Sequence, residues 1–430
     1  MKKKLIKGLD LEVYSEKLSN GLEVYIIPFK NVKLTYATYT TRYGGNNNEF
    51  IPYGEKEMIN VPKGIAHFLE HKMFEQEDGS DAFKYFNENG ARANAYTSSK
   101  QTTYLFSGVN EFYNNLKHLL SYVESPYFTD KNVEKEKGII KEEIHMGDDN
   151  PYSRVYKGLL FNSLINHPMK YPVIGTDESV SSITKEDLYK CYNTFYHPSN
   201  MFLVITGNVD PVITIKLIRD HENKRNLKSK RKITLGEYKE PNEVFRKEEK
   251  LKMDITVPKI GIAYKINIKD IKLNKYKVRS YILSGISTKL DETSLFYEKM
   301  SKKDILTIPV DLDGIVLDDH IIVMILAETN NPSLLLKEIK KELKDLSITE
   351  EEHNRAIKSS ICSQITSSDN IFKMNNLLMS SIINNGEVIY NPIKRIRKYN
   401  LKEYKKIISS IKLDNYTIFE IDPLKGFFVK

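Results

Sequence analysis

The strongest constraint on the fold is an order of predicted strands and helices that occurs twice along the chain. In the first half, two strand-like segments, two helical segments and two further strands precede a run of helices, which ends at an apolar strand over 201–207. After residue 246 the same order returns and ends at a strand over 416–421. Because strands are grouped apart from a run of helices, we expect an α+β fold, with helices covering a mixed or antiparallel sheet. The repeat predicts two homologous domains.

A polar, basic segment without helical or strand periodicity separates the two predicted halves. We therefore expect a first domain over residues 1–221, a linker over 222–245 and a second domain over 246–430. The chain of 430 residues is long for one domain and sufficient for two. Its net charge of +8 is a small excess of 65 basic over 57 acidic residues, so we expect no nucleic-acid partner.

Cysteine content and the lack of long apolar segments bear on the compartment. The only two cysteines, Cys191 and Cys362, lie far apart, which fits a reducing compartment. Residues 1–4 are basic like the start of a signal peptide, but charged residues interrupt the turns that follow. No segment approaches the about 18 apolar residues of a membrane span. We expect a soluble, cytoplasmic protein without a membrane span.

Residues 67–71, His-Phe-Leu-Glu-His, form the most specific motif of the sequence. His67 and His71 are four residues apart, so on a helix both imidazoles project from one face. Two imidazoles in this arrangement can hold one Zn²⁺. Glu70 can then reach a water at the metal and accept its proton without binding the metal. The flanking residues are apolar, and burying such polar groups without a ligand is costly. We therefore favour a metal site over a chance pattern.

A zinc site for hydrolysis needs a third protein ligand and an open fourth position. The predicted helix over 133–146 offers Glu136 and Glu143, which are seven residues apart and share an apolar stripe. Its other charges have the pattern of a solvent-exposed face. Taken alone, this segment is better explained as an amphipathic helix that tolerates glutamates on its apolar side. The nearby His-x-x-Glu-His motif favours a metal ligand in this helix.

The segment Gly64–His71 resembles the signature of the pitrilysin/insulinase family of zinc metallopeptidases, the inverzincins. It is most similar to the two-domain branch, which includes mitochondrial processing peptidase and paired bacterial relatives. The stretch 136–143 resembles the segment that supplies the family's third ligand. The resemblance implies one Zn²⁺ per chain, with ligands at His67, His71 and Glu143. It also implies that Glu70 is the catalytic base and that Glu136 supports the metal ligands without binding the metal itself.

Residues 93–98, Ala-Asn-Ala-Tyr-Thr-Ser, are similar to the family's substrate-aligning strand. The resemblance implies that a peptide binds in an extended conformation and adds a strand to a sheet edge. The residues that would offer this edge are Asn94, Ala95, Tyr96 and Thr97. On sequence alone they are equally an ordinary buried strand. The resemblance further implies that the two domains form a clam-shell around an internal chamber, which would favour short or unfolded peptides.

One part of the family's site has no counterpart in this sequence. Active members commonly carry an Arg and, seven residues later, a Tyr that assist at the scissile carbonyl. The matching stretch 295–307 has Met300 and Thr307 at these positions. A homologous partner chain could supply the Arg/Tyr pair, which would make this chain the catalytic subunit of a heterodimer. Otherwise the chain alone is a weak enzyme.

Together these features predict a zinc metalloendopeptidase that hydrolyses short or unfolded peptides, with processing of a small precursor peptide as one option. The alternative is a catalytically weak or inactive subunit that binds peptides or serves as a scaffold, because the family contains members that lost activity. Small metal-dependent hydrolases and lyases also carry the motif. They are single short domains, however, and this chain is too long for that class.

Overall fold

The structure is a computed structural model that describes residues 1–225, 227 and 232–424. The chain forms two compact units, and both are α+β. Unit 1 contains residues 1–144, 172–237 and 361–395; unit 2 contains residues 145–171 and 238–360 and the described residues from 396 onward. The predicted α+β class is confirmed. Residues 226 and 228–231 of the predicted linker, and 425–430 of the predicted second domain, lie outside the described residues.

Unit 1 is built on a seven-stranded sheet with strand order β1-β2-β3-β9-β4-β8-β7. The strands are β1 (Lys2–Ile6), β2 (Leu11–Lys17), β3 (Glu23–Pro28), β4 (Thr35–Thr41), β7 (Ala91–Thr97), β8 (Thr102–Gly108) and β9 (Met201–Gly207). Strands β3 and β9 are parallel, and the other neighbours are antiparallel. The short strands β5 (Glu49–Phe50) and β6 (Ile59–Asn60) pair separately. The central strands β4 and β9 are buried throughout, which fits their β-branched and aromatic residues.

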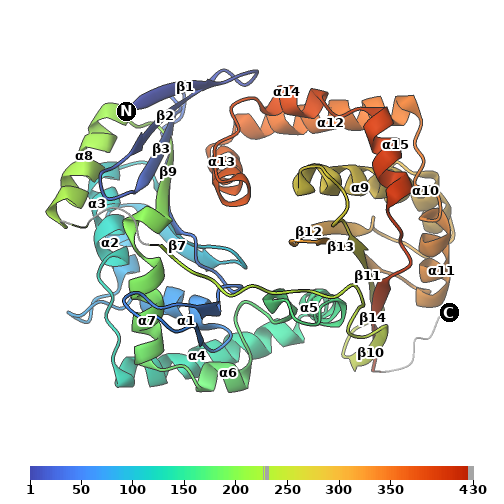
Figure 1. Ribbon diagram of the computed structural model, residues 1–430, viewed down its shortest axis with the longest axis horizontal. Helices are drawn as coiled ribbons and strands as arrows, with labels where there is room; N and C mark the ends of the chain where they lie inside the picture. Colours follow the sequence, from blue (N-terminus) through green and yellow to red (C-terminus); the bar gives the residue numbers. More distant parts are fainter. Residues whose placement is uncertain (226, 228–231, 425–430) are drawn as a thin grey trace. The chain divides into compact units, whose positions relative to one another are not determined.

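Helices cover both faces of this sheet (Figure 1). Alternate side chains of β9 enter different cores: Leu203 and Ile205 pack with the helices of one face, whereas Phe202 and Val204 pack under a single helix on the other. That single helix is α13 (Ile371–Asn385). The helices that contribute to the first core are α1 (Ile65–Lys72), α2 (Ala82–Glu88), α3 (Phe112–Val123), α4 (Asp130–Asp149), α6 (Asp177–Ser181), α7 (Lys185–Phe195) and α8 (Pro211–Lys224). A short 3₁₀ turn occupies Pro198–Asn200, and another, Pro168–Lys170, belongs to unit 2.

Unit 2 is built on a five-stranded sheet with strand order β10-β14-β11-β13-β12. The strands are β10 (Glu248–Met253), β11 (Lys259–Asn267), β12 (Asp311–Val316), β13 (His320–Glu328) and β14 (Tyr416–Pro423). One core joins this sheet to α9 (Lys275–Leu290), α10 (Leu295–Lys302), α11 (Pro332–Glu342) and α15 (Leu401–Ser410), and α5 (Pro151–Ser163) packs on the other face. Two further helices of the described residues, α12 (Glu350–Ser368) and α14 (Pro392–Arg397), each have residues in both units.

The two sheets share one connectivity. Strands β3-β9-β4-β8-β7 of unit 1 correspond in order and direction to β10-β14-β11-β13-β12 of unit 2, including the parallel first pair. Each half of the sequence also gives one helix to the other sheet, because α5 belongs to unit 2 and α13 to unit 1. The compact units are therefore discontinuous in sequence. The contiguous domains 1–221 and 246–430 with the linker 222–245 stay a prediction.

One local difference from the sequence expectations has a clear cause. The apolar residues of the stretch 305–310 predict a strand there, which is wrong, because the edge strand is β12, at 311–316. Ile305 and Leu306 are apolar because they are buried in the core of unit 2, not because they pair in the sheet.

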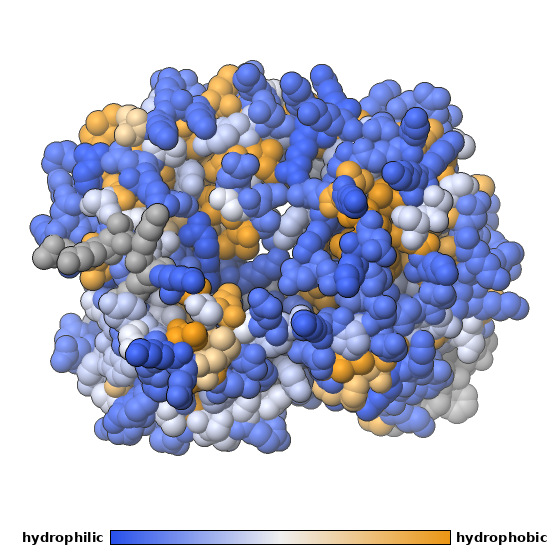
Figure 2. Space-filling model, viewed as in Figure 1, coloured by the Kyte–Doolittle hydropathy of each residue, from blue (hydrophilic) through white to orange (hydrophobic). Residues whose placement is uncertain are grey.

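The surface shown in Figure 2 is mainly hydrophilic, and apolar side chains are scattered over it. None of the helices in the described part of the chain is long and apolar enough to cross a membrane.

Candidate metal centre

Helix α1 carries the His-x-x-Glu-His motif and begins directly after Gly64. Gly64 has φ of 89°, a conformation that side chains disfavour, and a Cβ there would lie 2.4 Å from the carbonyl oxygen of Ile174. Only glycine therefore allows the chain to enter the helix at this point. Phe68 and Leu69 are buried in the core, whereas the rings of His67 and His71 are partly exposed. The periodicity of α1 thus places the two histidine rings together on the partly exposed side of the helix.

The structure brings the three predicted zinc ligands together. His67 Nε2 lies 3.7 Å from Glu143 Oε1, and His71 Nε2 lies 3.5 Å from Glu143 Oε2. One ligand atom from each residue lies within 4.8 Å of the others. Ligand atoms around a tetrahedral zinc with bonds of about 2.1 Å are separated by about 3.4 Å. Burial and the neighbouring His71 lower the pKa of His67 to about 3, so this ring is neutral, as a metal ligand must be. The donor set fits zinc.

Glu136 lies behind His71 on the side away from Glu143. Its Oε1 accepts a hydrogen bond from His71 Nδ1 at 3.0 Å, which leaves the lone pair of Nε2 free. Its Oε2 lies 3.6 Å from Nζ of Lys72, which is fully buried and also contacts Glu75 at 2.5 Å. Burial acts to raise the pKa of Glu136, but the hydrogen bond with His71 and the charge of Lys72 lower it below its ordinary value. The sequence expectations missed Lys72, although a lysine next to the motif on an apolar helix was a signal.

Glu70 is buried beside the two histidines and receives a hydrogen bond from strand β7. Thr97 Oγ1 donates to Glu70 Oε2 at 2.5 Å. Burial raises the pKa of Glu70, and the hydrogen bond from Thr97 opposes this shift. A carboxylate with a raised pKa accepts a proton more readily, which suits a general base.

The predicted peptide-binding residues lie on β7, the edge strand of the seven-stranded sheet. The turn Ser98–Gln101 closes on a hydrogen-bonded pair, so the alternation of the ladder directs the backbone groups of Ala95 and Thr97 toward the free edge. The side chains of Asn94 and Tyr96 lie on the opposite face of the sheet from α1, and Tyr96 packs against α13. The Asn94 carboxamide accepts the Ala95 N–H at 2.9 Å.

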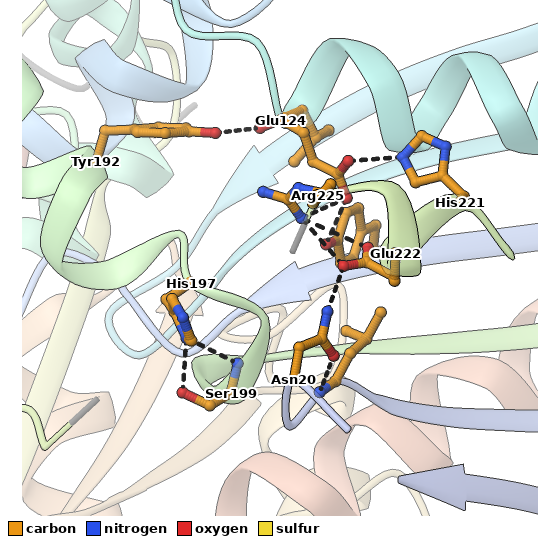
Figure 3. A network of polar contacts seen from close by, with 11 residues as sticks. Asn20, Glu124, Tyr192, His197, Ser199, His221, Glu222 and Arg225 are labelled. Carbon is orange, nitrogen blue, oxygen red and sulfur yellow. Dashed lines mark hydrogen bonds and ion pairs between the residues drawn. The ribbon is translucent and has the colours of Figure 1, made fainter. Parts of the chain in front are cut away.

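A second group of metal-type side chains lies at the end of α8 (Figure 3). Glu124 accepts from His221 Nε2 at 2.7 Å, and Asn20 donates to Glu222 at 2.6 Å. Arg225 lies 2.9 Å from Glu124 and 3.2 Å from Glu222, so a guanidinium already balances both carboxylates. This group is an ion-pair network rather than a metal site. Burial and the neighbouring Glu124 raise the pKa of Glu222 well above its ordinary value.

Comparison with known proteins identifies the family. The family model described as Insulinase (Peptidase family M16) matches residues 56–177, and the model described as Peptidase M16 inactive domain matches residues 182–360. The solved structure of an M16-like protein from Alicyclobacillus acidocaldarius is 30% identical and covers 96% of this chain and 99% of that chain, with a TM-score of 0.90. The chain belongs to the insulinase (M16) peptidase family. The predicted family is therefore confirmed.

Several M16 relatives have names that refer to zinc-dependent proteolysis. The uncharacterized zinc protease YmfH of Bacillus subtilis is 49% identical over 266 residues, which cover 61% of this chain and 62% of YmfH. An uncharacterized zinc protease of Rickettsia felis is 28% identical over 45% of this chain and 46% of the relative. The matched stretches thus span less than two thirds of these relatives. A protease structure from Helicobacter pylori shares the fold, with 20% identity, a TM-score of 0.80 and coverage of 96% and 99% of the two chains.

Proposed function

We propose that this M16 chain is a zinc-dependent endopeptidase. The observation that carries the proposal is the convergence of His67, His71 and Glu143 at ligand spacing, with the buried carboxylate of Glu70 beside them. When bound, Zn²⁺ supplies a Lewis acid that polarises a carbonyl and lowers the pKa of water to about 7. The zinc protease names of the relatives agree with this chemistry.

In the proposed reaction, each residue has a role that follows from its position. Glu70 takes the proton of the attacking water and later gives it to the leaving amine. Glu136 holds the ring of His71 through Nδ1. The free edge of β7, at Ala95 and Thr97, pairs with the main chain of an extended peptide. Pairing through the main chain requires an extended peptide but no particular side chains. Short or unfolded peptides are therefore the expected substrates.

We further infer that a homologous partner chain completes the enzyme. In the stretch expected to carry the Arg/Tyr pair, Met300 is buried in the core of unit 2 and Thr307 is a short, exposed side chain. Neither can donate as an Arg or a Tyr would to an oxyanion. This fold also occurs as half of a longer chain, because this chain covers 47% of PqqL from Escherichia coli, with a TM-score of 0.72. A partner supplying the Arg/Tyr pair would make the active species a heterodimer.

The test measures zinc and cleavage in the same samples. The wild-type chain, Glu70→Gln, Glu143→Gln and the exposed neighbour Glu142→Gln are purified, and zinc is quantified by elemental analysis. Cleavage of unstructured peptides is followed by mass spectrometry, with the partner chain added to every sample if activity requires it. We expect about one zinc per chain in all but Glu143→Gln, and cleavage only by wild type and Glu142→Gln. Equal cleavage by Glu70→Gln would refute the proposal.

The partner is tested by recovery from the native cell. Affinity capture of the wild-type chain should recover a related chain that carries an Arg and a Tyr seven residues apart, and adding that chain should raise kcat/KM. Full activity of the monomeric chain on peptides would refute the proposal that the active species is a heterodimer. Zinc bound without cleavage in the presence of that partner would favour the alternative, an inactive peptide-binding or scaffold subunit.

A further inference from the structure

We infer that Thr97 is a positioning residue for the general base, and that it links the orientation of Glu70 to the strand that pairs with the peptide. This inference rests on the proposed function. Thr97 is the last residue of β7, and its hydroxyl reaches across to α1 and donates to Glu70 Oε2 at 2.5 Å. The same residue therefore offers its backbone to the sheet edge and its side chain to the base.

The direction of this hydrogen bond is fixed by the groups around it. A threonine hydroxyl has one proton to donate. Thr102 Oγ1 lies 3.2 Å from Thr97 Oγ1, but it donates its proton to the carbonyl oxygen of Tyr43 at 3.0 Å, and a carbonyl can only accept. Thr102 can therefore only accept from Thr97. Of the two acceptors near the Thr97 hydroxyl, the carboxylate oxygen of Glu70 is the nearer, at 2.5 Å against 3.2 Å, and a carboxylate accepts more strongly than a hydroxyl, so the proton goes to Glu70.

This assignment distinguishes the two oxygens of the base. Oε2 of Glu70 already accepts a hydrogen bond from Thr97, so Oε1 is the oxygen with both lone pairs open to a water. Because a carboxylate can rotate about its terminal torsion, an anchor on one oxygen fixes where the other one points. Without Thr97, the carboxylate would sample orientations in which Oε1 is displaced from the attacking water.

The anchor itself is held rigidly. The turn that follows Thr97 is bonded to the loop after β4: Gly45 N–H donates to the carbonyl of Ser98, and Asn46 N–H donates to the carbonyl of Ser99, both at 2.9 Å. Gly44 allows this close approach, since a Cβ there would lie 2.4 Å from the carbonyl oxygen of Ser98. The position of Thr97 is thus set by two segments of backbone, and a peptide that pairs with its edge would add a third support.

The link between edge and base has a functional consequence. A peptide that pairs along β7 forms backbone hydrogen bonds next to Thr97, the residue that orients Glu70. Correct pairing and correct base orientation therefore depend on one residue. We expect that loss of the Thr97 hydroxyl impairs the chemical step more than it impairs peptide binding, because the backbone at the edge is unchanged.

The experiment compares Thr97→Val, which keeps the shape and removes the hydroxyl, with Thr97→Ser, which keeps the hydroxyl. Thr35→Val is the control, because Thr35 is a buried threonine of the same sheet whose hydroxyl donates to the carbonyl of Gly108 at 2.8 Å, at the end of the β4–β8 pair away from Thr97. Zinc content, thermal unfolding, kcat and KM are measured for each variant with its partner chain present if activity requires one.

We expect Thr97→Val to lower kcat by about 10- to 100-fold, with KM within about threefold of wild type and full zinc content. Thr97→Ser should stay within about threefold of wild type, and Thr35→Val should keep the wild-type kcat. A Thr97→Val enzyme with normal kcat, a Thr97→Ser enzyme as slow as Thr97→Val, or loss of zinc from Thr97→Val would each overturn the inference. If the wild type has no Glu70-dependent cleavage, the proposed function has failed instead.

Discussion

Replacing Glu136 by Gln should weaken zinc binding although it changes no ligand. The side chain keeps its size, but the hydrogen bond to His71 Nδ1 at 3.0 Å is no longer charge-assisted. Among the described residues, buried Lys72 then keeps Glu75 alone as an anionic partner. The ring of His71 then becomes a weaker and less constrained donor. Loss of such a supporting carboxylate typically weakens metal affinity by about 10- to 100-fold, which corresponds to about 1.4–2.7 kcal/mol.

Two measurements report this change. Competition with a chromogenic chelator gives the zinc dissociation constant for wild type and variant. Thermal or urea unfolding with and without zinc gives the stabilisation by the metal, which should fall by the same about 1.4–2.7 kcal/mol when zinc is well above both dissociation constants. Glu134→Gln is the matched control, since Glu134 is an exposed residue of the same helix that pairs only with Lys137 among the described residues.

The two outcomes separate a supporting role from a purely structural one. If Glu136→Gln bound zinc as tightly as wild type, the hydrogen bond to His71 would not tune the site and the reasoning would be refuted. If Glu134→Gln lost zinc equally, the effect would lie in the charge or stability of α4. A metal-free Glu136→Gln protein of lower stability is expected as well, because a buried ammonium has lost part of its compensation.

Three further predictions concern the framework around the site. Gly64→Ala should lower the free energy of unfolding by at least about 1–3 kcal/mol and reduce zinc content, because φ of 89° and the carbonyl of Ile174 leave no room for a Cβ; unchanged urea unfolding and zinc content would contradict this. Asn375→Ala should destabilise unit 1 by about 1–3 kcal/mol, since the fully buried amide bonds Thr38 and the carbonyl of Val204, each at 2.9 Å, and hydrogen exchange should increase in α13; equal protection in both proteins would argue against it. Burial and Glu124 raise the pKa of Glu222 in the folded state, so the folded state binds the proton more tightly than the unfolded state does. The free energy of unfolding therefore falls as the pH rises from the ordinary glutamate pKa of about 4.3 toward the raised pKa. Glu222→Gln should therefore gain stability relative to wild type as urea unfolding is moved from acidic to mildly alkaline pH, and a difference independent of pH would exclude this linkage.

Features that depend on local geometry could be predicted from the sequence. The spacing of His67, Glu70 and His71 places their side chains on one stretch of helix, because 3.6 residues per turn is a property of the backbone and not of its surroundings. The apolar runs likewise predicted β9 at 201–207 and β14 at 416–421, and the repeated order of elements predicted two similarly folded halves. Glycine at position 64 was part of the motif, but the φ and the close carbonyl that require it were not visible.

Features that depend on packing between distant segments were decided only by the tertiary structure. Glu136 and Glu143 share one stripe of α4, so their spacing could not distinguish them; the approach of α4 to α1 places Glu143 near both Nε2 atoms and Glu136 at Nδ1 of His71. The amphipathic patterns of α5 and α13 did not reveal which sheet each one covers, because an apolar stripe fits either core. The sequence determined that the chain would present a zinc-type helix; the contacts of that helix with α4 and β7 decided which carboxylate faces it and which hydroxyl orients Glu70.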